Sequence, residues 1–389
     1  MRVLMVAPTP FFGDRGCHIR ILEEARALHG LGVQTLVVTY PVGRDHPEVA
    51  TVRSPRVPWV RSLPVGFSPH RPYLDGMLFA TTLRAARRFR PDILHGHLHE
   101  GAAIASLVGR LVRRPAVADL QGSVTDEMIA HGHLPARGPL PASLRRLERL
   151  VLHWPARLLP SSANFAQELV DVWRVPRERV VLLADGIDPE FLRPGPVPDD
   201  LRERLGLVDK RVVVYLGVLT KYQGIDDLLA AWPVVMAAVP DAHLLLMGHP
   251  NVEHYRARAG TLTPPGSVTL TGRIDYADSP RYLALGDVAV SPKHVSTEAN
   301  GKLLNYMAMG LPAVAYEGPV SRELLGEAGV FAPMRDVSAL GAAIAGLLRD
   351  PHEQKLRGQA LRERAVAHFG WPALGRRLAD VYRTCLEER

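Results

Sequence analysis

A dense run of polar side chains separates two apolar segments near residue 300. The run holds two lysines, a threonine, a glutamate and an asparagine: Lys293, Thr297, Glu298, Asn300 and Lys302. It follows a strand-like segment, residues 287–291, and leads into a helix-like segment, residues 301–309. Loops placed between a parallel strand and a helix are where ligands bind, and a helix N-terminus favours phosphate because its N–H groups are unpaired. The pattern indicates phosphate binding, although an ordinary strand–helix–strand unit would also explain it.

Two glycine-containing loops have the same position between a strand and a helix. The first, residues 8–17, contains Gly13 and Gly16, and the second, residues 217–224, contains Lys221. Glycine lets backbone N–H groups approach a ligand closely, because it has no side chain. The first loop lacks the G-x-G-x-x-G spacing of dinucleotide sites, so we do not predict NAD. A plain turn is the alternative for this loop.

Three histidines stand close together after a predicted strand: His95, His97 and His99. Their spacing is not that of a structural zinc site, and no second pair of ligands accompanies them in the sequence. We interpret them as side chains that line a cleft, in preference to the alternative of a metal site.

Strand-like and helix-like segments alternate along both halves of the chain. The predicted strands are residues 2–7, 33–40, 92–95, 116–120, 157–160, 180–183, 211–216, 244–247, 268–271, 287–291 and 312–315. The predicted helices include residues 18–29, a helix from Gly101, and residues 142–153, 225–239, 301–309, 337–348, 352–368 and 372–388. This alternation indicates two doubly wound parallel sheets. The proline-rich residues 193–200 are the clearest linker, and residues 44–72 form a long loop of the kind that is usually functional or mobile.

Composition excludes several classes of protein. The chain has 389 residues, 47% of them hydrophobic, which is enough for two domains. Its two cysteines do not make a disulfide framework, so we expect a reducing compartment, the cytoplasm. We expect no secretory leader and no membrane span, because no apolar run reaches about 18 residues. The net charge of +7 suits phosphorylated ligands or an anionic membrane. Nucleic acid is not expected, because no basic stripe is interleaved with aromatic residues.

The segment Met307–Val314 (MAMGLPAV) resembles the end of the nucleotide-sugar signature of the retaining glycosyltransferases of family 4. Residues 185–188 (DGID), followed by Phe191, resemble the hinge of the same family. The resemblance covers nearly the whole chain. It implies the GT-B fold, an α/β architecture in which two Rossmann-like doubly wound parallel-sheet domains face a central cleft and the C-terminal helix crosses back to the first domain.

The resemblance also implies the division of the chain and the residues of the site. We expect an acceptor-side domain at 1–192, a linker at 193–205, a nucleotide-sugar-binding domain at 206–369 and a crossing helix at 370–389. Donor binding is expected from Gly16, Gly217, Lys221, Gly224, Arg273, Lys293, Thr297, Gly301, Lys302, Leu303 and Asn305. Residues expected at the reacting sugar are Gln121, Glu298 and Asn300, and those on the acceptor side are Arg15, His95 and His97.

Neutral residues stand at five positions that often carry charge in the family: Gln121, Val218, Gln223, Thr297 and Asn305. Glutamine cannot carry a proton, so Gln121 is not expected to act as a general acid or base. Either the chain belongs to an active subgroup that uses substitutes, or it has lost activity and binds or scaffolds. The polar residues of 293–302 favour activity, since an inactive site need not keep them. A sugar-nucleotide epimerase of the same fold is a third alternative.

The function expected from the resemblance is retaining transfer of a sugar from a nucleoside-diphosphate sugar, with UDP or GDP as the nucleotide, to a hydroxyl acceptor. In the family's usual account the leaving phosphate takes the acceptor proton, so no protein base is required. We expect no bound metal and no other cofactor. The arginine-rich residues 84–90 and 145–149 are either solvated helix faces or patches that contact the inner membrane face. The acceptor class and the oligomeric state stay open.

Overall fold

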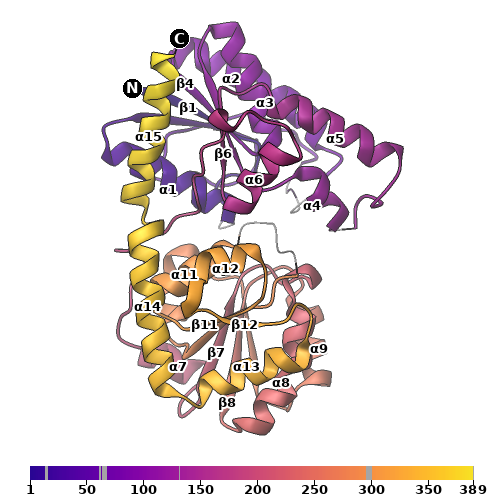
Figure 1. Cartoon of the computed structure of the whole chain (residues 1–389), viewed down its shortest axis with the longest axis vertical. Helices are drawn as coiled ribbons and strands as arrows, with labels where there is room; N and C mark the ends of the chain where they lie inside the picture. The colour runs from indigo at the N-terminus through magenta and orange to yellow at the C-terminus, as the bar shows by residue number, and fades with distance from the viewer. Residues whose placement is uncertain (14–15, 61–62, 64–67, 131, 295–299, 389) are drawn as a thin grey trace. The chain divides into compact units, whose positions relative to one another are not determined.

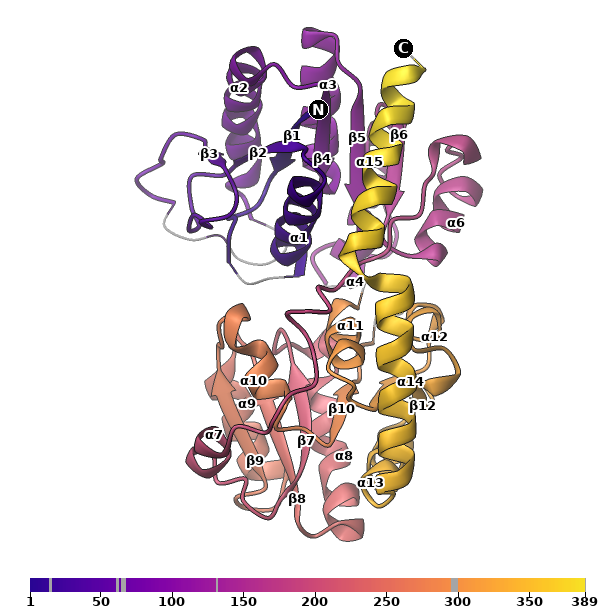
Figure 2. The same ribbon diagram turned by 90° about the vertical axis from the view of Figure 1, so that its left-hand side faces the viewer.

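The computed structural model describes residues 1–13, 16–60, 63, 68–130, 132–294 and 300–388. Two compact units divide the chain. Unit 1 comprises Met1–Gly186 and Trp371–Arg389, and unit 2 comprises Ile187–Gly370. Figures 1 and 2 show that each unit is built on a sheet flanked by helices. The linker expected at 193–205 lies inside unit 2 and includes the helix α7, Asp199–Arg204.

Unit 1 is a parallel six-stranded sheet with the strand order β3-β2-β1-β4-β5-β6. Its strands are β1 Arg2–Ala7, β2 Gln34–Thr39, β3 Thr51–Arg53, β4 Ile93–His97, β5 Ala116–Leu120 and β6 Arg157–Pro160. Its helices are α1 Gly16–Gly30, α2 Arg71–Phe89, α3 Leu98–Val112, α4 Val124–Ala130, α5 Pro139–Leu152, α6 Ala163–Asp171 and α15 Trp371–Glu387. β4 and β5 are buried along their whole length, as expected for parallel strands covered on both faces.

Unit 2 is a second parallel six-stranded sheet, with the order β12-β11-β10-β7-β8-β9. Its strands are β7 Arg211–Leu216, β8 Ala242–Met247, β9 Val268–Gly272, β10 Val288–Ser291, β11 Ala313–Tyr316 and β12 Val330–Ala332. Besides α7, its helices are α8 Ile225–Ala238, α9 Val252–Leu262, α10 Ser279–Leu283, α11 Gly301–Ala308, α12 Pro319–Leu325, α13 Val337–Leu348 and α14 Pro351–Phe369.

Each sheet has one point where the strand order reverses. In unit 1 it lies between β1 and β4, and in unit 2 it lies between β7 and β10. Loops that leave neighbouring strands at such a point diverge to opposite faces of the sheet, so a crevice for ligands forms at the carboxyl ends of the strands. The two reversal points are therefore where ligand-binding side chains are expected.

The C-terminal helix α15 belongs to unit 1. Its residues Leu374, Leu378 and Tyr382 share a hydrophobic cluster with Ile21 and Leu22 of α1. Both views place α15, drawn in yellow, beside the N-terminal sheet of unit 1 (Figures 1 and 2). The predicted crossing of the last helix to the first domain is confirmed.

Several short elements differ from the prediction. Residues 180–183, predicted as a strand, form only an isolated bridge between Val180 and Leu158. The strands β3 and β12 and the helix α4 were not predicted, and each is at most seven residues long. Elements this short are set by tertiary packing more than by local sequence. In the part of the chain that the structure describes, no helix combines the length and the apolar character needed to cross a membrane.

Candidate active site

Three loops of unit 2 approach one another through backbone atoms at the β7–β10 reversal point. A Cβ atom added at Gly224 would lie 1.8 Å from the carbonyl oxygen of Pro292, and Gly224 has φ +78°. A Cβ atom added at Gly248 would lie 1.7 Å from the carbonyl oxygen of Gly217. No side chain fits at such distances, so glycine is required at positions 224 and 248. The loops after β7, β8 and β10 are thereby fixed against one another at the carboxyl edge of the sheet.

Lys302 lies in the first turn of α11 and reaches this junction. Its Nζ donates to Oε1 of Gln223 at 2.6 Å and to Oδ1 of Asn300 at 3.2 Å. The ammonium group also lies 5.6 Å from the centre of the Tyr215 ring. Gln223 stands directly before the N-terminus of α8, so the contact joins the starts of two helices. A cation is thereby held where two helix N-termini supply additional positive potential.

Asn300 links the end of β10 to the start of α11. It is 5% exposed, and its amide exchanges hydrogen bonds with the Ser291 hydroxyl at 3.1 and 3.2 Å. Although Asn300 is the N-cap residue of α11, its side chain makes no capping hydrogen bond to the helix. The first N–H groups of α11 are therefore not satisfied by this side chain, which suits an anionic ligand.

The loop after β10 is anchored to α8 by groups that sequence reasoning missed. His294 Nε2 lies 2.8 Å from Oδ2 of Asp227, and the Tyr316 hydroxyl donates to the same oxygen at 2.8 Å. The backbone N–H of His294 donates to the carbonyl of Tyr222 at 2.9 Å. The only signal in the sequence was the acidic pair Asp226 and Asp227 in the first turn of α8, and this pair does not predict which residues bind to it. The neighbouring Lys293 is 7% exposed.

The remaining predicted donor residues do not all reach this junction. Lys221 and Arg273 are exposed, and Arg273 follows β9, the edge strand two places from β7. Gly301 begins α11, and the half-exposed Asn305 lies one turn further along it. The side chain of Leu303 is fully buried in the core, so the expectation that it contacts the donor is limited to its backbone. Thr297 and Glu298 lie outside the described residues.

In unit 1, the buried His18 of α1 hydrogen-bonds to Thr9 and Gly13 in the loop after β1. His18 accepts a hydrogen bond from the Gly13 N–H at Nδ1, 2.8 Å away, and its Nε2 contacts the Thr9 hydroxyl. A Cβ atom at Gly16 would meet nothing within 4 Å, so the fold of unit 1 does not itself require glycine there. Gln121 follows β5 and is half-buried. Arg15 lies outside the described residues.

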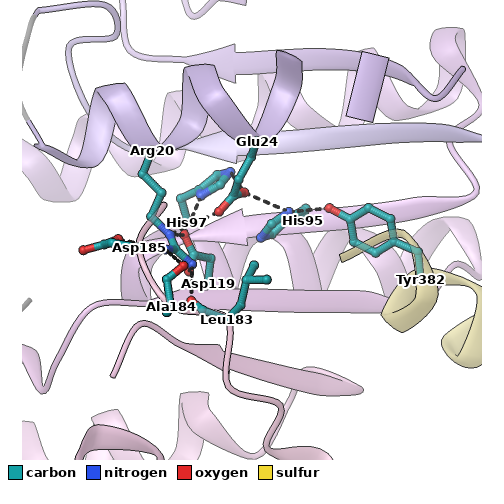
Figure 3. Close-up of polar contacts among 9 residues, drawn as sticks. All are labelled: Arg20, Glu24, His95, His97, Asp119, Leu183, Ala184, Asp185 and Tyr382. Atoms are coloured by element: carbon teal, nitrogen blue, oxygen red, sulfur yellow. Dashed lines mark hydrogen bonds and ion pairs between the residues drawn. The ribbon is translucent and has the colours of Figure 1, made fainter. Parts of the chain in front are cut away.

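His95 and His97 are buried rather than open to an acceptor. Their exposed fractions are 0% and 2%, and they stack with ring centres 4.4 Å apart (Figure 3). Both point toward α1, because alternate residues of β4 share one face of the sheet. The prediction that they line a cleft is corrected by this burial. The third histidine, His99, instead lies 3.1 Å from the buried carboxylate of Glu148.

Arg20 of α1 organises the buried groups around these histidines. Its guanidinium binds both carboxylate oxygens of Asp119 at 2.8 Å and one of Asp185 at 2.8 Å. It also donates to the carbonyls of Leu183 and Ala184, the last residues before Asp185 and the junction with unit 2 (Figure 3). The nearby Glu24 carboxylate lies 3.1 Å from Arg20 Nε. Five groups from three segments, α1, β5 and residues 183–185, thus meet at one guanidinium.

Burial and charge shift the pKa values of this cluster in opposite directions. Burial, followed by the charge of Asp119, holds the pKa of Glu24 well above its ordinary value. For Asp119 burial also acts upward, but Arg20 and His97 together outweigh it and hold the pKa below its ordinary value. Burial keeps the pKa of His95 well below its ordinary value. Asp119 is therefore an ionised hydrogen-bond acceptor, and His95 is neutral.

Comparisons with known proteins match both units. A family model described as "Glycosyl transferase 4-like domain" matches residues 15–186, and one described as "Glycosyl transferases group 1" matches residues 210–350. The D-inositol 3-phosphate glycosyltransferase of Thermobispora bispora is 28% identical over 97% of this chain and 92% of its own length. A GDP-mannose-dependent alpha-(1-6)-phosphatidylinositol monomannoside mannosyltransferase of Mycolicibacterium smegmatis is 29% identical over 72% of this chain and 74% of its own length.

Solved structures show the same fold. Sucrose-phosphate synthase from Thermosynechococcus elongatus superposes with a TM-score of 0.81 at 19% identity over 100% of both chains. Anabaena Alr3699/HepE, solved in complex with UDP and glucose, superposes with a TM-score of 0.79 at 15% identity over 98% of this chain and 99% of its own. Together the family models, the relatives and the shared fold show that this chain belongs to the family 4 glycosyltransferases, glycosyl transferases group 1, with the GT-B fold.

Proposed function

We propose that this glycosyltransferase moves a sugar from a nucleoside-diphosphate sugar to a hydroxyl acceptor with retention of the anomeric configuration. The observation that carries the proposal is the position of Lys302, a cation held at 2.6 Å from Gln223 between the starts of α8 and α11. A cation beside two helix N-termini at a reversal point of a parallel sheet is suited to a diphosphate.

In this proposal Lys302 supplies a positive charge next to Gln223, a neutral residue at a position that often carries charge in the family. Gln223 and Asn300 are neutral amides that accept hydrogen bonds from the ammonium group. The two amides fix the position of Lys302, and the N–H groups of α11 add hydrogen bonds to the phosphate oxygens. Charge that develops on the leaving diphosphate is stabilised by groups already in place, which is the form of stabilisation that lowers a barrier most.

In the proposed transfer, every bond and proton is accounted for without a protein base. The acceptor oxygen forms a bond to the anomeric carbon while the bond between that carbon and the diphosphate oxygen breaks. The acceptor proton passes to the leaving phosphate. Asn305 is assigned to the ribose hydroxyls and Asn300 to the region of the sugar, whereas Gln121 can only hydrogen-bond. Lys302 and the N-terminus of α11 would supply the stabilising charge at the donor, so we expect no metal requirement there.

A nucleotide panel tests donor binding first. The melting temperature of the whole chain is measured with UDP, GDP and ADP, each with and without magnesium. A ligand at about 100 times its dissociation constant adds roughly 2.7 kcal/mol, which moves the melting temperature by several degrees. A shift with one nucleotide, unchanged by magnesium, supports the proposal and names the donor class. No shift with any nucleotide contradicts it and favours a scaffold without a working donor site.

The matching nucleotide sugar then separates transfer from the two other activities. Incubation without acceptor should leave the donor intact over the time in which transfer to an acceptor is complete. Conversion of the donor to another sugar nucleotide would identify an epimerase. Binding without any turnover across acceptors would identify a binding protein.

We further propose a lipid-linked acceptor at an anionic membrane, because α5 has an exposed face that is both apolar and basic. Leu140, Leu147 and Leu150 are 62%, 55% and 53% exposed. Arg145, Arg146 and Arg149 are exposed on the same helix, although Arg145 also pairs with Asp126. Helices with exposed leucines flanked by arginines bind at the lipid interface. Relatives named for phosphatidylinositol monomannoside and phosphatidyl-myo-inositol are consistent with such an acceptor.

Vesicle flotation tests this surface. The whole chain should float with phosphatidylglycerol vesicles and much less with phosphatidylcholine vesicles. Leu147→Ser should reduce flotation several-fold, whereas Leu356→Ser, at a leucine of α14 with the same 55% exposure, should not. Equal flotation of both variants, or none by the wild type, would leave glycan or small-molecule acceptors as the better assignment.

A further inference from the structure

Unit 1 contains a buried cluster of potential metal ligands that the proposed sugar transfer does not use. Glu24 of α1, His95 and His97 of β4, and Asp119 of β5 each offer one ligand atom, and these atoms lie within 4.8 Å of one another. Glu24 Oε2 is 3.8 Å from His95 Nδ1 and 4.0 Å from His97 Nε2. Both separations are too long for hydrogen bonds. Among the described residues, no hydrogen bond joins Glu24 to either histidine.

The tautomer of His97 follows from its neighbours. Nδ1 lies 3.1 Å from Oδ2 of Asp119, a carboxylate that also binds Arg20 and can only accept. Nδ1 therefore carries the hydrogen, and Nε2 presents a lone pair toward Glu24. Among the described residues, neither this Nε2 nor either carboxylate oxygen of Glu24 has a hydrogen-bond partner. Buried acceptors that face one another are unfavourable unless a proton or a cation stands between them.

The charges of the cluster are unbalanced when Glu24 is ionised. Arg20 lies within 3.1 Å of Glu24 and 2.8 Å of both Asp119 and Asp185. When all three carboxylates are ionised, one positive charge faces three negative charges. Uncompensated buried charge costs several kcal/mol, and a divalent cation would offset the remaining two negative charges.

We propose that Glu24, His95 and His97 bind one divalent transition-metal ion, with zinc as the best chemical match. Imidazole nitrogen and carboxylate oxygen bind zinc at about 2.0–2.2 Å, so two ligands of one ion lie about 3.4 Å apart in a tetrahedron and about 4.2 Å apart when opposite. The 4.0 Å between Glu24 Oε2 and His97 Nε2 falls between these limits.

The surroundings of the three ligands have the features of an outer ligand shell. A carboxylate that holds the far nitrogen of a metal-binding histidine is the usual arrangement in zinc sites, and Asp119 has this relation to His97. The hydroxyl of Tyr382 on α15 lies 2.7 Å from His95 Nδ1 (Figure 3), so this nitrogen is engaged, and His95 would bind the ion through Nε2, which has no hydrogen-bond partner among the described residues. Every ligand is buried, so the ion would have a structural role in joining α1 to β4. The sequence did not predict this site, because the Glu24 carboxylate lies on α1, far from His95 and His97 in the sequence.

Zinc binding by the whole chain tests the proposal. Protein treated with a chelator and then dialysed is titrated with zinc alone, followed by measurement of metal content and melting temperature. We expect about one zinc ion per chain and a higher melting temperature. X-ray absorption at the zinc edge should show two imidazole ligands. Glu24→Gln and His97→Gln should abolish stoichiometric binding, whereas His99→Gln, beside the cluster but paired with Glu148, should retain it.

Zinc uptake by the wild type is by itself enough to overturn the proposal. The test therefore does not depend on whether the variants fold. A folded wild type that takes up no zinc, with an infrared band for a protonated carboxylic acid that Glu24→Gln removes, would show that a proton occupies this space. Zinc that stays bound in Glu24→Gln and His97→Gln would belong to another site. Nucleotide binding in unit 2 should be the same with and without zinc, which keeps this test separate from the donor assignment.

Discussion

In unit 1, the polar side chains next to the reversal point face inward and mostly meet one another. Arg20, Asp119 and Glu24 are buried there within 3.1 Å of a partner. In unit 2, the cation at the equivalent point is half-buried and held by two amides, beside a helix start that Asn300 does not cap. One sheet architecture thus uses its reversal point in two ways: buried ion pairs hold unit 1 together, whereas in unit 2 a lysine lies beside helix starts where we propose that the diphosphate binds. The first arrangement should govern stability, and the second should govern binding.

The largest effect on stability is expected from Arg20→Met in unit 1. The change leaves Asp119 buried without its bidentate partner, so the free energy of unfolding should fall by about 3–5 kcal/mol. Urea denaturation of both proteins measures it. Arg383→Met, which removes an exposed pair with Asp380, should cost less than about 1 kcal/mol. Similar losses for the two variants would contradict a structural role for the buried cluster.

A smaller loss is expected from Gly224→Ala in unit 2. The added Cβ would lie 1.8 Å from the Pro292 carbonyl at a φ of +78°, so the loop must shift, at a cost of about 1–3 kcal/mol. The shift moves Gln223, so nucleotide affinity should fall as well. Gly260→Ala in α9 is the control, because its Cβ would meet nothing within 4 Å. Calorimetric titration measures the nucleotide affinity of both variants, and urea denaturation measures their free energy of unfolding. Unchanged values for Gly224→Ala would show that the close contact between the loops contributes to neither binding nor stability.

Asn305→Ala should weaken nucleotide binding without a comparable loss of stability. Asn305 is half-exposed on α11, so its removal takes away one or two ligand hydrogen bonds worth about 1–3 kcal/mol in all. Calorimetric titration with the nucleotide found in the panel measures the change. An unchanged affinity would remove Asn305 from the ribose assignment.

The smallest effect concerns pH. Burial, opposed by the hydrogen bond from Tyr40, raises the pKa of Asp75 to about 6. Because the folded state holds this proton more tightly than the unfolded state, the contribution of Asp75 to stability falls as pH rises from about 4 to about 6. Asp75→Asn should gain about 1 kcal/mol over the wild type at pH 7, with no gain near pH 4. Urea denaturation at both pH values measures this, and an equal difference at the two values would contradict it.

The sequence predicted the fold because its signals were local. Apolar strands alternate with helices, and the ends of β1, β5, β6 and β7 match the prediction residue for residue. β3 and β12 were missed because they are three residues each, too short to show periodicity. The side chain of Ser162 caps α6 by accepting a hydrogen bond from the Phe165 N–H, an interaction that is also local in the sequence.

The sites were predicted less completely because their geometry is tertiary. The polar run from Lys293 to Lys302 was identified, but the pairing of Lys302 with Gln223 joins residues 79 apart. In the buried cluster, Arg20 and Glu24 resemble an ordinary surface pair at helical spacing. The available signal was Asp119, a charged residue inside an otherwise apolar strand, which implies a buried partner.

Calorimetric titration of nucleotide into Lys302→Ala and Lys221→Ala tests whether Lys302 binds the diphosphate of the donor. Both variants remove one lysine near the start of a helix, but only Lys302 is held at the β7–β10 junction, while Lys221 is exposed. We predict that Lys302→Ala weakens binding of the nucleoside diphosphate by about 1.5–3 kcal/mol, or roughly 10- to 150-fold, and that Lys221→Ala changes it less than about threefold. Full affinity in Lys302→Ala together with a large loss in Lys221→Ala would contradict the role of Lys302. The diphosphate site would then be assigned to the exposed loop that contains Lys221.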